Sequence, residues 1–176
     1  MSIRSIGSLV ALSALLLSGC GNAVEEDVEP AGVIGLTRTT SGDVAVVAKI
    51  CRSTIDQVVV NRDREGLSET EKNPTVATYT SSKPLKGDVQ LVLARPGASW
   101  SPSEPLELEA DRGYLISAQG SGDDARETGT VWVTGRLLDT VKAGSIFVDG
   151  GNPDRATLDQ KTPAQFAAQA KAVCSD

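Results

Sequence analysis

Apolar and polar residues alternate in short runs along most of the chain after Gly32, and turn-forming residues separate these runs. In DVQLVLA, for example, Val89, Leu91 and Leu93 fall on one face of an extended segment. The pattern predicts strands at residues 32–39, 44–51, 55–61, 75–80, 88–94, 105–109, 113–119 and 129–137. TSGD, residues 40–43, is typical of a tight hairpin turn between the first two strands. Short strands at this spacing favour a sandwich or a barrel.

The last segment changes to a helical period. Thr162 and Gln165 are spaced as a capping box, and Pro163 suits the first helical position. Four apolar residues then recur at helical spacing, namely Phe166, Ala167, Ala170 and Val173. We therefore expect a short C-terminal helix that packs its apolar face on the sheet.

The stretch LELEADRGYLISA places Leu108 and Gly113 ahead of Tyr114, with Ile116 and Ala118 alternating after it. This arrangement resembles the corner between strands E and F of fibronectin type III and related immunoglobulin-like domains. The resemblance implies that the Tyr114 ring closes the core and that its hydroxyl bonds back to the corner backbone. The predicted fold is all-β: an immunoglobulin-like β-sandwich of seven or eight mostly antiparallel strands with a short C-terminal helix.

The N-terminus has the pattern of a signal peptide, with Arg4 followed by an apolar run from Leu9 to Leu17. This run is much shorter than the ~20 residues that a transmembrane helix needs. Leu17, Ser18, Gly19 and Cys20 resemble the bacterial lipobox. The resemblance implies cleavage before Cys20 and a diacylglycerol on its thiol, which anchors the protein on the extracytoplasmic face of the cell membrane. The alternative is an ordinary signal peptide with an incidental cysteine.

The domain organisation follows from these segments. Residues 1–19 are predicted to be the lipoprotein signal peptide, residues 20–31 an acylated cysteine with an acidic flexible tether, and residues 32–176 the sandwich domain. The segment GNAVEEDVEPAG favours a solvated tether over an acidic recognition segment. The whole chain also resembles small lipoproteins of actinobacteria through its lipobox, its DVAVVAKIC strand and its late cysteine. That resemblance implies no activity.

Charge and composition exclude several classes of function. The chain has no histidine, so it cannot supply a Ser-His-Asp triad, a Cys-His pair or a His-containing zinc site. Its net charge is −6 and it has no basic cluster with interleaved aromatics, which argues against binding of nucleic acid. A carboxylate pair, a Ser-Lys dyad or a thiol remain as catalytic options. No cofactor is predicted.

Two loops concentrate oxygen ligands suited to calcium: one has Asp123, Asp124 and Glu127, and the other has Asp149, Asn152 and Asp154. Neither spacing matches a known calcium loop, and Asp, Asn and Gly are also preferred in solvated turns for backbone reasons. We therefore predict no metal site.

The two tryptophans are the candidates for contact with a partner. Trp100 lies in GASWSPSEP, where it either folds back onto the edge of the core or presents its ring to a partner. Trp132 alternates with Val131 and Val133, so it lies on the opposite face from these valines. Tyr114, Phe147 and Phe166 are assigned to the core.

Cys51 and Cys174 are predicted to form a disulfide between the second strand and the C-terminal helix. With Cys20 acylated, two thiols remain in an oxidising compartment, where they usually pair. Cys174 borders the apolar face of the helix, and the parity of Cys51 places that helix on the outer face or the edge of the sheet. Two buried thiols and a redox-active pair are the alternatives.

The predicted function is that of a membrane-anchored, non-enzymatic envelope module that binds a protein or glycan partner. Two alternatives remain open. One is an envelope hydrolase that uses a carboxylate pair, and the other is an extracytoplasmic binder of a small solute or ion. A flat patch around a tryptophan would favour the module, two buried carboxylates in a pocket the hydrolase, and a deep apolar cavity the solute binder.

Overall fold

The computed structural model of the chain describes residues 29–122 and 125–175. The predicted signal peptide and Cys20 lie outside the described residues. The strands are β1 (Gly32–Arg38), β2 (Val44–Arg62), β3 (Thr75–Val92), β4 (Trp100–Pro102), β5 (Gly113–Gln119), β6 (Val131–Thr134), β7 (Ile146–Asp149) and β8 (Leu158–Lys161). The helices are α1 (Gly135–Leu138) and α2 (Pro163–Ser175). No helix in this part of the chain is long and apolar enough to cross a membrane.

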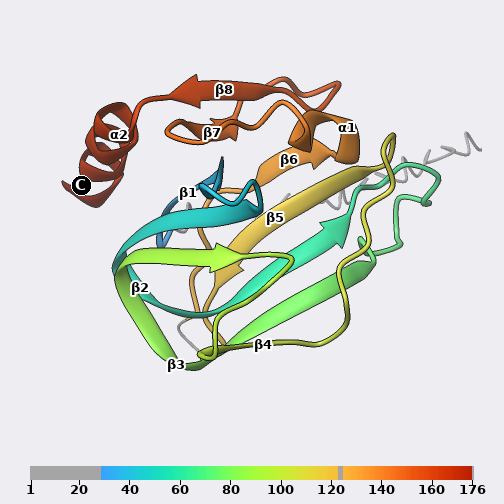
Figure 1. The fold of residues 1–176 in the computed structure, drawn as a ribbon. Helices are drawn as coiled ribbons and strands as arrows, with labels where there is room; N and C mark the ends of the chain where they lie inside the picture. Colours follow the sequence, from blue (N-terminus) through green and yellow to red (C-terminus); the bar gives the residue numbers. More distant parts are fainter. Residues whose placement is uncertain (1–28, 123–124, 176) are drawn as a thin grey trace, which may run out of the picture.

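The strands form one antiparallel sheet that folds over itself. The main path is β4-β3-β2-β1-β7-β8, and β5 joins β2 to β6. The first half of β2 pairs with β1, and its second half, from Gln57 to Arg62, pairs with β5. Register shifts between Ile50 and Gln57 interrupt the β2–β3 ladder, as expected of bulges that bend a strand. Figure 1 shows the two halves of β2 running in different directions on either side of this bend.

One apolar core fills the space between the two halves of the sheet. Val46, Ala48 and Ile50 reach it from before the bend in β2, and Val58 and Val60 reach it from after the bend. The core therefore has the layered arrangement of a sandwich, although β2 and β3 belong to both layers. The predicted all-β class with eight mostly antiparallel strands and a short C-terminal helix is confirmed.

The corner before β5 has the bond that the resemblance implied. The backbone N–H of Glu109 donates to the Tyr114 hydroxyl at 2.8 Å, and the Tyr114 side chain is buried. The hairpin turn at residues 40–43 is also present, because Thr39 N–H donates to Asp43 O at 2.9 Å and Gly42 adopts a φ of 88°. A positive φ of this kind favours glycine.

Several predicted strand boundaries are wrong. Residues 105–109 form no strand, because Leu106 and Leu108 pack on the core without a neighbouring strand to pair with. The strand predicted at residues 129–137 is limited to β6, since Thr134 accepts a hydrogen bond from Leu137 N–H and begins α1. The pattern missed β4, β7 and β8, which have only three or four residues each.

The C-terminal helix forms as predicted. Thr162 N–H donates to Gln165 Oε1 at 2.8 Å, and Gln165 N–H donates to Thr162 Oγ1 at 3.2 Å, so the capping box is complete. Phe166 and Ala170 are buried against Val33 and Val148, whereas Ala167 is exposed. The helix therefore covers the outer face of β1 and β7.

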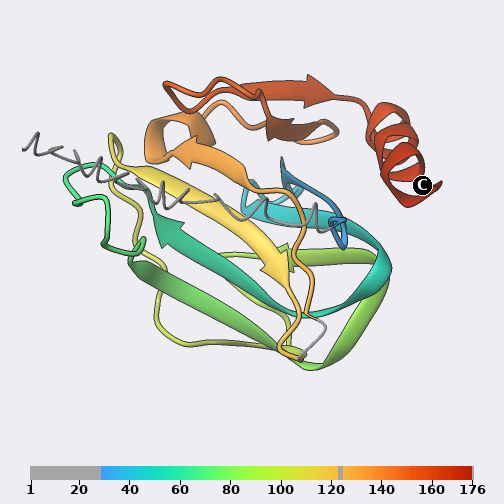
Figure 2. The same cartoon turned by 180° about the vertical axis from the view of Figure 1, so that it is seen from behind.

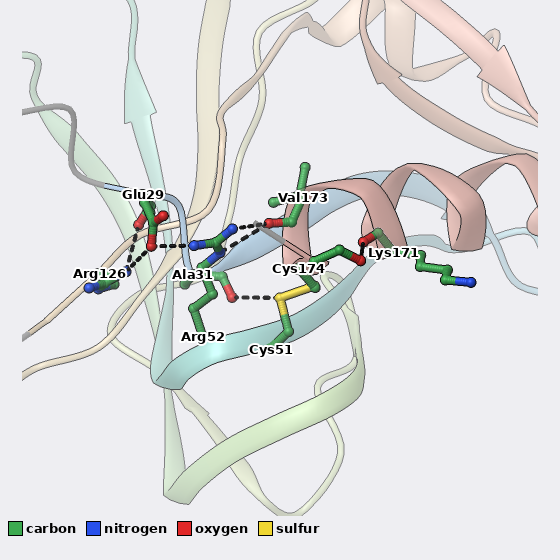
Figure 3. Close-up of a disulfide and its surroundings, with 9 residues drawn as sticks. Glu29, Ala31, Cys51, Arg52, Arg126, Lys171, Val173 and Cys174 are labelled. Carbon is green, nitrogen blue, oxygen red and sulfur yellow. Dashed lines mark hydrogen bonds and ion pairs between the residues drawn. A yellow bond between two sulfur atoms is a disulfide. The ribbon is translucent and has the colours of Figure 1, made fainter.

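Cys51 and Cys174 form the predicted disulfide, with Cα atoms 5.8 Å apart. It joins the bend of β2 to the last turn of α2 (Figure 3). The Cys51 Sγ atom also lies 3.7 Å from Ala31 O, and Cys51 N–H donates to the same oxygen at 2.9 Å. The disulfide thus ties together the beginning, the middle and the end of the described domain.

Candidate functional site

Trp132 lies on the outer face of β6. Val131 and Val133 point into the core and are buried, whereas Trp132 is half-buried and faces away from it. Trp132 pairs across the ladder with Leu115 of β5, which is also half-buried. The alternation seen in the sequence therefore places this tryptophan on the surface, as predicted.

Trp100 is in a different position. Only 7% of its surface is exposed, and it belongs to the main core together with Tyr79. Trp100 begins β4, which pairs with the edge of β3, so its ring faces inward and Ser101 faces solvent. The structure favours the core-edge position for Trp100, and Trp100 is not a candidate for contact with a partner.

Gly113 forms the floor beside Trp132. A Cβ atom at this position would lie 1.8 Å from Asp63 Oδ2 and 2.9 Å from Trp132 Nε1. The Asp63 carboxylate and the edge of the indole ring therefore occupy the space that any larger residue would fill. Trp132 Nε1 is buried and has no hydrogen-bond partner among the described residues. Because its nitrogen is covered, the exposed part of the indole ring is carbon.

Trp132 lines a pocket with a volume of about 440 Å³. Gly113, Thr134 and Ala156 line it as well, and six ionic residues complete it, namely Asp63, Arg64, Glu65, Asp111, Asp154 and Arg155. The pocket therefore combines an aromatic carbon surface with charges of both signs.

Three of these ionic side chains are engaged by the surrounding loops. Arg64 donates to the carbonyl oxygens of Ser68 and Glu71 at 2.6 and 2.8 Å. Glu65 pairs with Arg112, and Asp111 pairs with Arg136. These contacts hold the loops around the pocket.

The other three ionic side chains have no ion pair among the described residues. Asp63 accepts only the backbone N–H of Glu65, through Oδ1 at 3.2 Å. Asp154 and Arg155 are exposed, and their backbone N–H groups donate to Asn152 Oδ1 at 2.9 and 3.2 Å. Asn152 thus organises the loop that carries two charges to the pocket, and Asp63 Oδ2 adds a third.

The end of the molecule beside the disulfide is held by a cluster of charges around Arg52. The Arg52 guanidinium donates to Val173 O at 2.6 Å, near the end of α2, and it also pairs with Glu29 (Figure 3). Arg126 pairs with Glu29 from the other side. Hydrogen bonds from Arg52 and then Arg126 lower the pKa of the Glu29 carboxyl. Glu29 therefore belongs to the domain, although the predicted tether extended to residue 31.

The Trp132 pocket lies far from this charged cluster. Along the bent path of β2, Arg52 and Arg62 are separated by at most about 33 Å at ~3.3 Å per residue, and Asp63 follows directly. In Figures 1 and 2, α2 lies at one end of the molecule, and the loop after β2 lies at the opposite end beside α1. The pocket and the entry of the chain into the domain are therefore at opposite ends.

A second, larger concavity is mainly apolar and has a volume of about 730 Å³. We call it the apolar groove; it is lined by Val44, Tyr79, Leu93, Leu106, Leu108 and Leu138 together with Arg38 and three prolines. Two polar side chains at its wall, Arg38 and Tyr79, are engaged within the protein, whereas the exposed Glu104 at its rim has no hydrogen-bond partner among the described residues. Arg38 donates to the carbonyl oxygens of Leu138 and Val141, and Tyr79 donates to Leu93 O at 3.0 Å. Burial raises the pKa of Tyr79 to about 12.

Every described carboxylate whose pKa is shifted has a lowered pKa, which does not suit a general acid. Hydrogen bonds from Ser41 and Arg95 lower the pKa of Asp43, which lines the apolar groove. A general acid in glycoside hydrolysis needs a raised pKa instead. These lowered pKa values give no support to the hydrolase alternative.

The two loops that concentrate possible calcium ligands differ in how much of them is described. Asp123 and Asp124 lie outside the described residues. In the other loop, Asp149 Oδ2 accepts Gly151 N–H and Asn152 Oδ1 accepts two backbone N–H groups, as in ordinary turns. Within residues 29–122 and 125–175, no group of three or more His, Cys, Asp or Glu side chains is placed to hold a metal ion.

Comparison of the chain with protein-family models, with curated proteins and with solved structures finds no match. The evidence for the candidate site therefore comes from the geometry of the structure alone. The sequence indicated Trp132, but it did not indicate Asp63 or Arg155, which lie in loops far from Trp132 along the chain. The sequence indicated Gly113 only as the residue that precedes Tyr114 in the immunoglobulin-like corner.

Proposed function

We propose that this protein is a membrane-anchored lipoprotein of the cell envelope and acts as a non-enzymatic binding module. The observation that carries the proposal is the half-buried Trp132 ring on the outer face of β6, in a pocket with Asp63, Asp154 and Arg155. An aromatic carbon surface beside polar groups that are not engaged elsewhere is typical of a binding site. The partner is a protein or a glycan of the envelope.

Two features support the extracytoplasmic location. The Cys51–Cys174 disulfide is of a kind that persists in oxidising compartments, and the lipobox-like residues precede the domain at Cys20. The tether from Cys20 would enter the domain at Glu29, beside the charged cluster. The Trp132 pocket lies at the opposite end of the domain.

The anchor and the binding site can be tested separately. Cys20→Ala should move the protein from the detergent phase to soluble or uncleaved forms in phase partitioning. Retention of the purified protein on isolated envelope stripped of membrane should fall about tenfold in Trp132→Ala. Trp100→Phe, at the buried tryptophan, is the matched control and should leave retention unchanged. Equal retention of Trp132→Ala and the unmodified protein would rule out the binding role of this pocket.

The apolar groove favours a second candidate function, the binding of an apolar solute. Its volume is within the ~300–1,000 Å³ of small-molecule sites, and Arg38 and Tyr79 at its wall make internal hydrogen bonds. The fluorescent probe N-phenylnaphthylamine should bind the unmodified protein and bind Leu108→Gln about tenfold more weakly. Leu115→Gln, on the outer face of β5, is the control. No fluorescence enhancement by the unmodified protein would remove this candidate.

A further inference from the structure

The ligand class of the Trp132 pocket follows from the groups that line it. Trp132 offers carbon rather than its N–H group, because Nε1 is covered beside Gly113 and Asp63. A ligand must therefore present an apolar face to the ring. A flat face of C–H groups satisfies this requirement without removing any polar group from water.

The charges around the ring have both signs. Asp63 and Asp154 supply acceptors, and Arg155 supplies donors, and none of the three has an ion pair among the described residues. An anionic ligand such as a phosphate or a uronate would meet the two carboxylates. A cationic ligand such as a lysine side chain would meet Arg155 beside the ring. A neutral ligand with hydroxyl groups avoids both conflicts, because each hydroxyl donates and accepts hydrogen bonds.

We propose that the Trp132 pocket binds a neutral saccharide unit of an envelope glycan. This inference rests on the proposed function and names its partner. The sugar C–H face packs on the Trp132 ring, sugar hydroxyls donate to the Asp63 and Asp154 carboxylates, and Arg155 donates to sugar oxygens. The volume of about 440 Å³ is in the range of ligand sites. The pocket lies at the end of the domain opposite the charged cluster. At this end, envelope polymers are accessible to an anchored protein.

The test uses the full chain purified from membranes in a mild detergent. The probes are three neutral tetrasaccharides (maltotetraose, mannotetraose and chitotetraose), with tetragalacturonate and tetralysine as the charged counterparts. Binding is measured by calorimetry and by tryptophan fluorescence. We expect at least one neutral tetrasaccharide to bind and to change the fluorescence of the unmodified protein, and neither charged oligomer to bind more tightly than it.

The variants assign the binding to this pocket. Trp132→Ala should weaken it at least about tenfold, and Trp100→Phe should leave it unchanged. Asp154→Asn and Arg155→Gln alter exposed loop side chains, so they keep the test valid if Trp132→Ala fails to fold, and each should weaken binding about threefold or more.

Three outcomes would overturn the saccharide inference: no binding of any neutral tetrasaccharide up to about 10 mM, tighter binding of a charged oligomer, or binding unaffected by all three pocket variants. If the pocket variants still lower retention on the envelope while no neutral tetrasaccharide binds, the inference fails and the proposed function stands. If the variants leave retention unchanged, the proposed function fails.

Discussion

At the scale of single residues, the packing on the outer face of β5 and β6 depends on Gly113, which has no side chain. Gly113 is buried, and the Asp63 carboxylate and the Trp132 indole approach its Cα closely. The next residue, Tyr114, points the other way and accepts a hydrogen bond from Glu109 N–H. The two adjacent residues therefore act on opposite faces of β5. The Tyr114 side chain closes the core, and the absence of a side chain at Gly113 leaves room for Asp63 and Trp132.

Gly113→Ala should destabilise the fold by about 1–3 kcal/mol, because the new Cβ would overlap Asp63 and crowd the rigid indole ring. Urea unfolding monitored by circular dichroism measures this change. Gly129→Ala is the matched control, since its Cβ would meet nothing within 4 Å. A Gly113→Ala protein as stable as the Gly129→Ala protein would contradict the close packing described here.

At the scale of elements, α2 depends on several contacts outside its own sequence. Its apolar face is small, with only Phe166 and Ala170 buried. The capping box holds its first turn, and the Cys174 disulfide with the Arg52 contact to Val173 holds its last turn. Helices of this length are marginal in water on their own, so the covalent link has a large effect on whether α2 stays folded.

Reduction of the disulfide should lower the free energy of unfolding by about 4–5 kcal/mol in the chain-entropy account of a loop of this size. The amide hydrogens of α2 should then exchange with solvent much faster than those of β5. Hydrogen exchange with and without reductant measures both effects. Thr162→Ala, which removes one cap, should cost only about 1 kcal/mol. Unchanged protection of α2 after reduction would show that packing alone holds the helix.

At the scale of the whole molecule, the two layers are joined through the same strands. β2 and β3 each pass through both layers, and a single core receives side chains from both sides of the bend. Ile55 lies at the bend and is completely buried. Neither layer can separate from the other without breaking the longest ladder in the sheet.

We therefore expect the disulfide-bonded domain to unfold in one cooperative transition. Denaturation followed by far-ultraviolet circular dichroism reports the whole sheet, and tryptophan fluorescence reports Trp100 in the core and Trp132 in β6. The two curves should coincide, with the same midpoint. Midpoints that differ beyond experimental error would indicate that one layer unfolds independently, which the shared strands argue against.

Local signals predicted the parts of the fold that depend on neighbours in sequence. The capping box at Thr162 and Gln165, the turn around Gly42 and the alternation that exposes Trp132 each act over a few residues. Leu106 and Leu108 misled the prediction for the opposite reason. Their alternation correctly indicates that one side is buried, but a strand also needs a hydrogen-bonding neighbour, which alternation does not reveal.

The sequence by itself determined the all-β class, the C-terminal helix, the pairing of Cys51 with Cys174 and the outward position of Trp132. These predictions follow from periodicity, from caps and from the two thiols that remain once Cys20 is assigned to the lipobox. All of these signals can be read from the sequence. Only the tertiary structure decided that Trp100 is buried and that Asp63, Gly113 and Arg155 meet at Trp132. Contacts between segments far apart in sequence depend on strand register and on the bend of β2, and no local pattern specifies either of these.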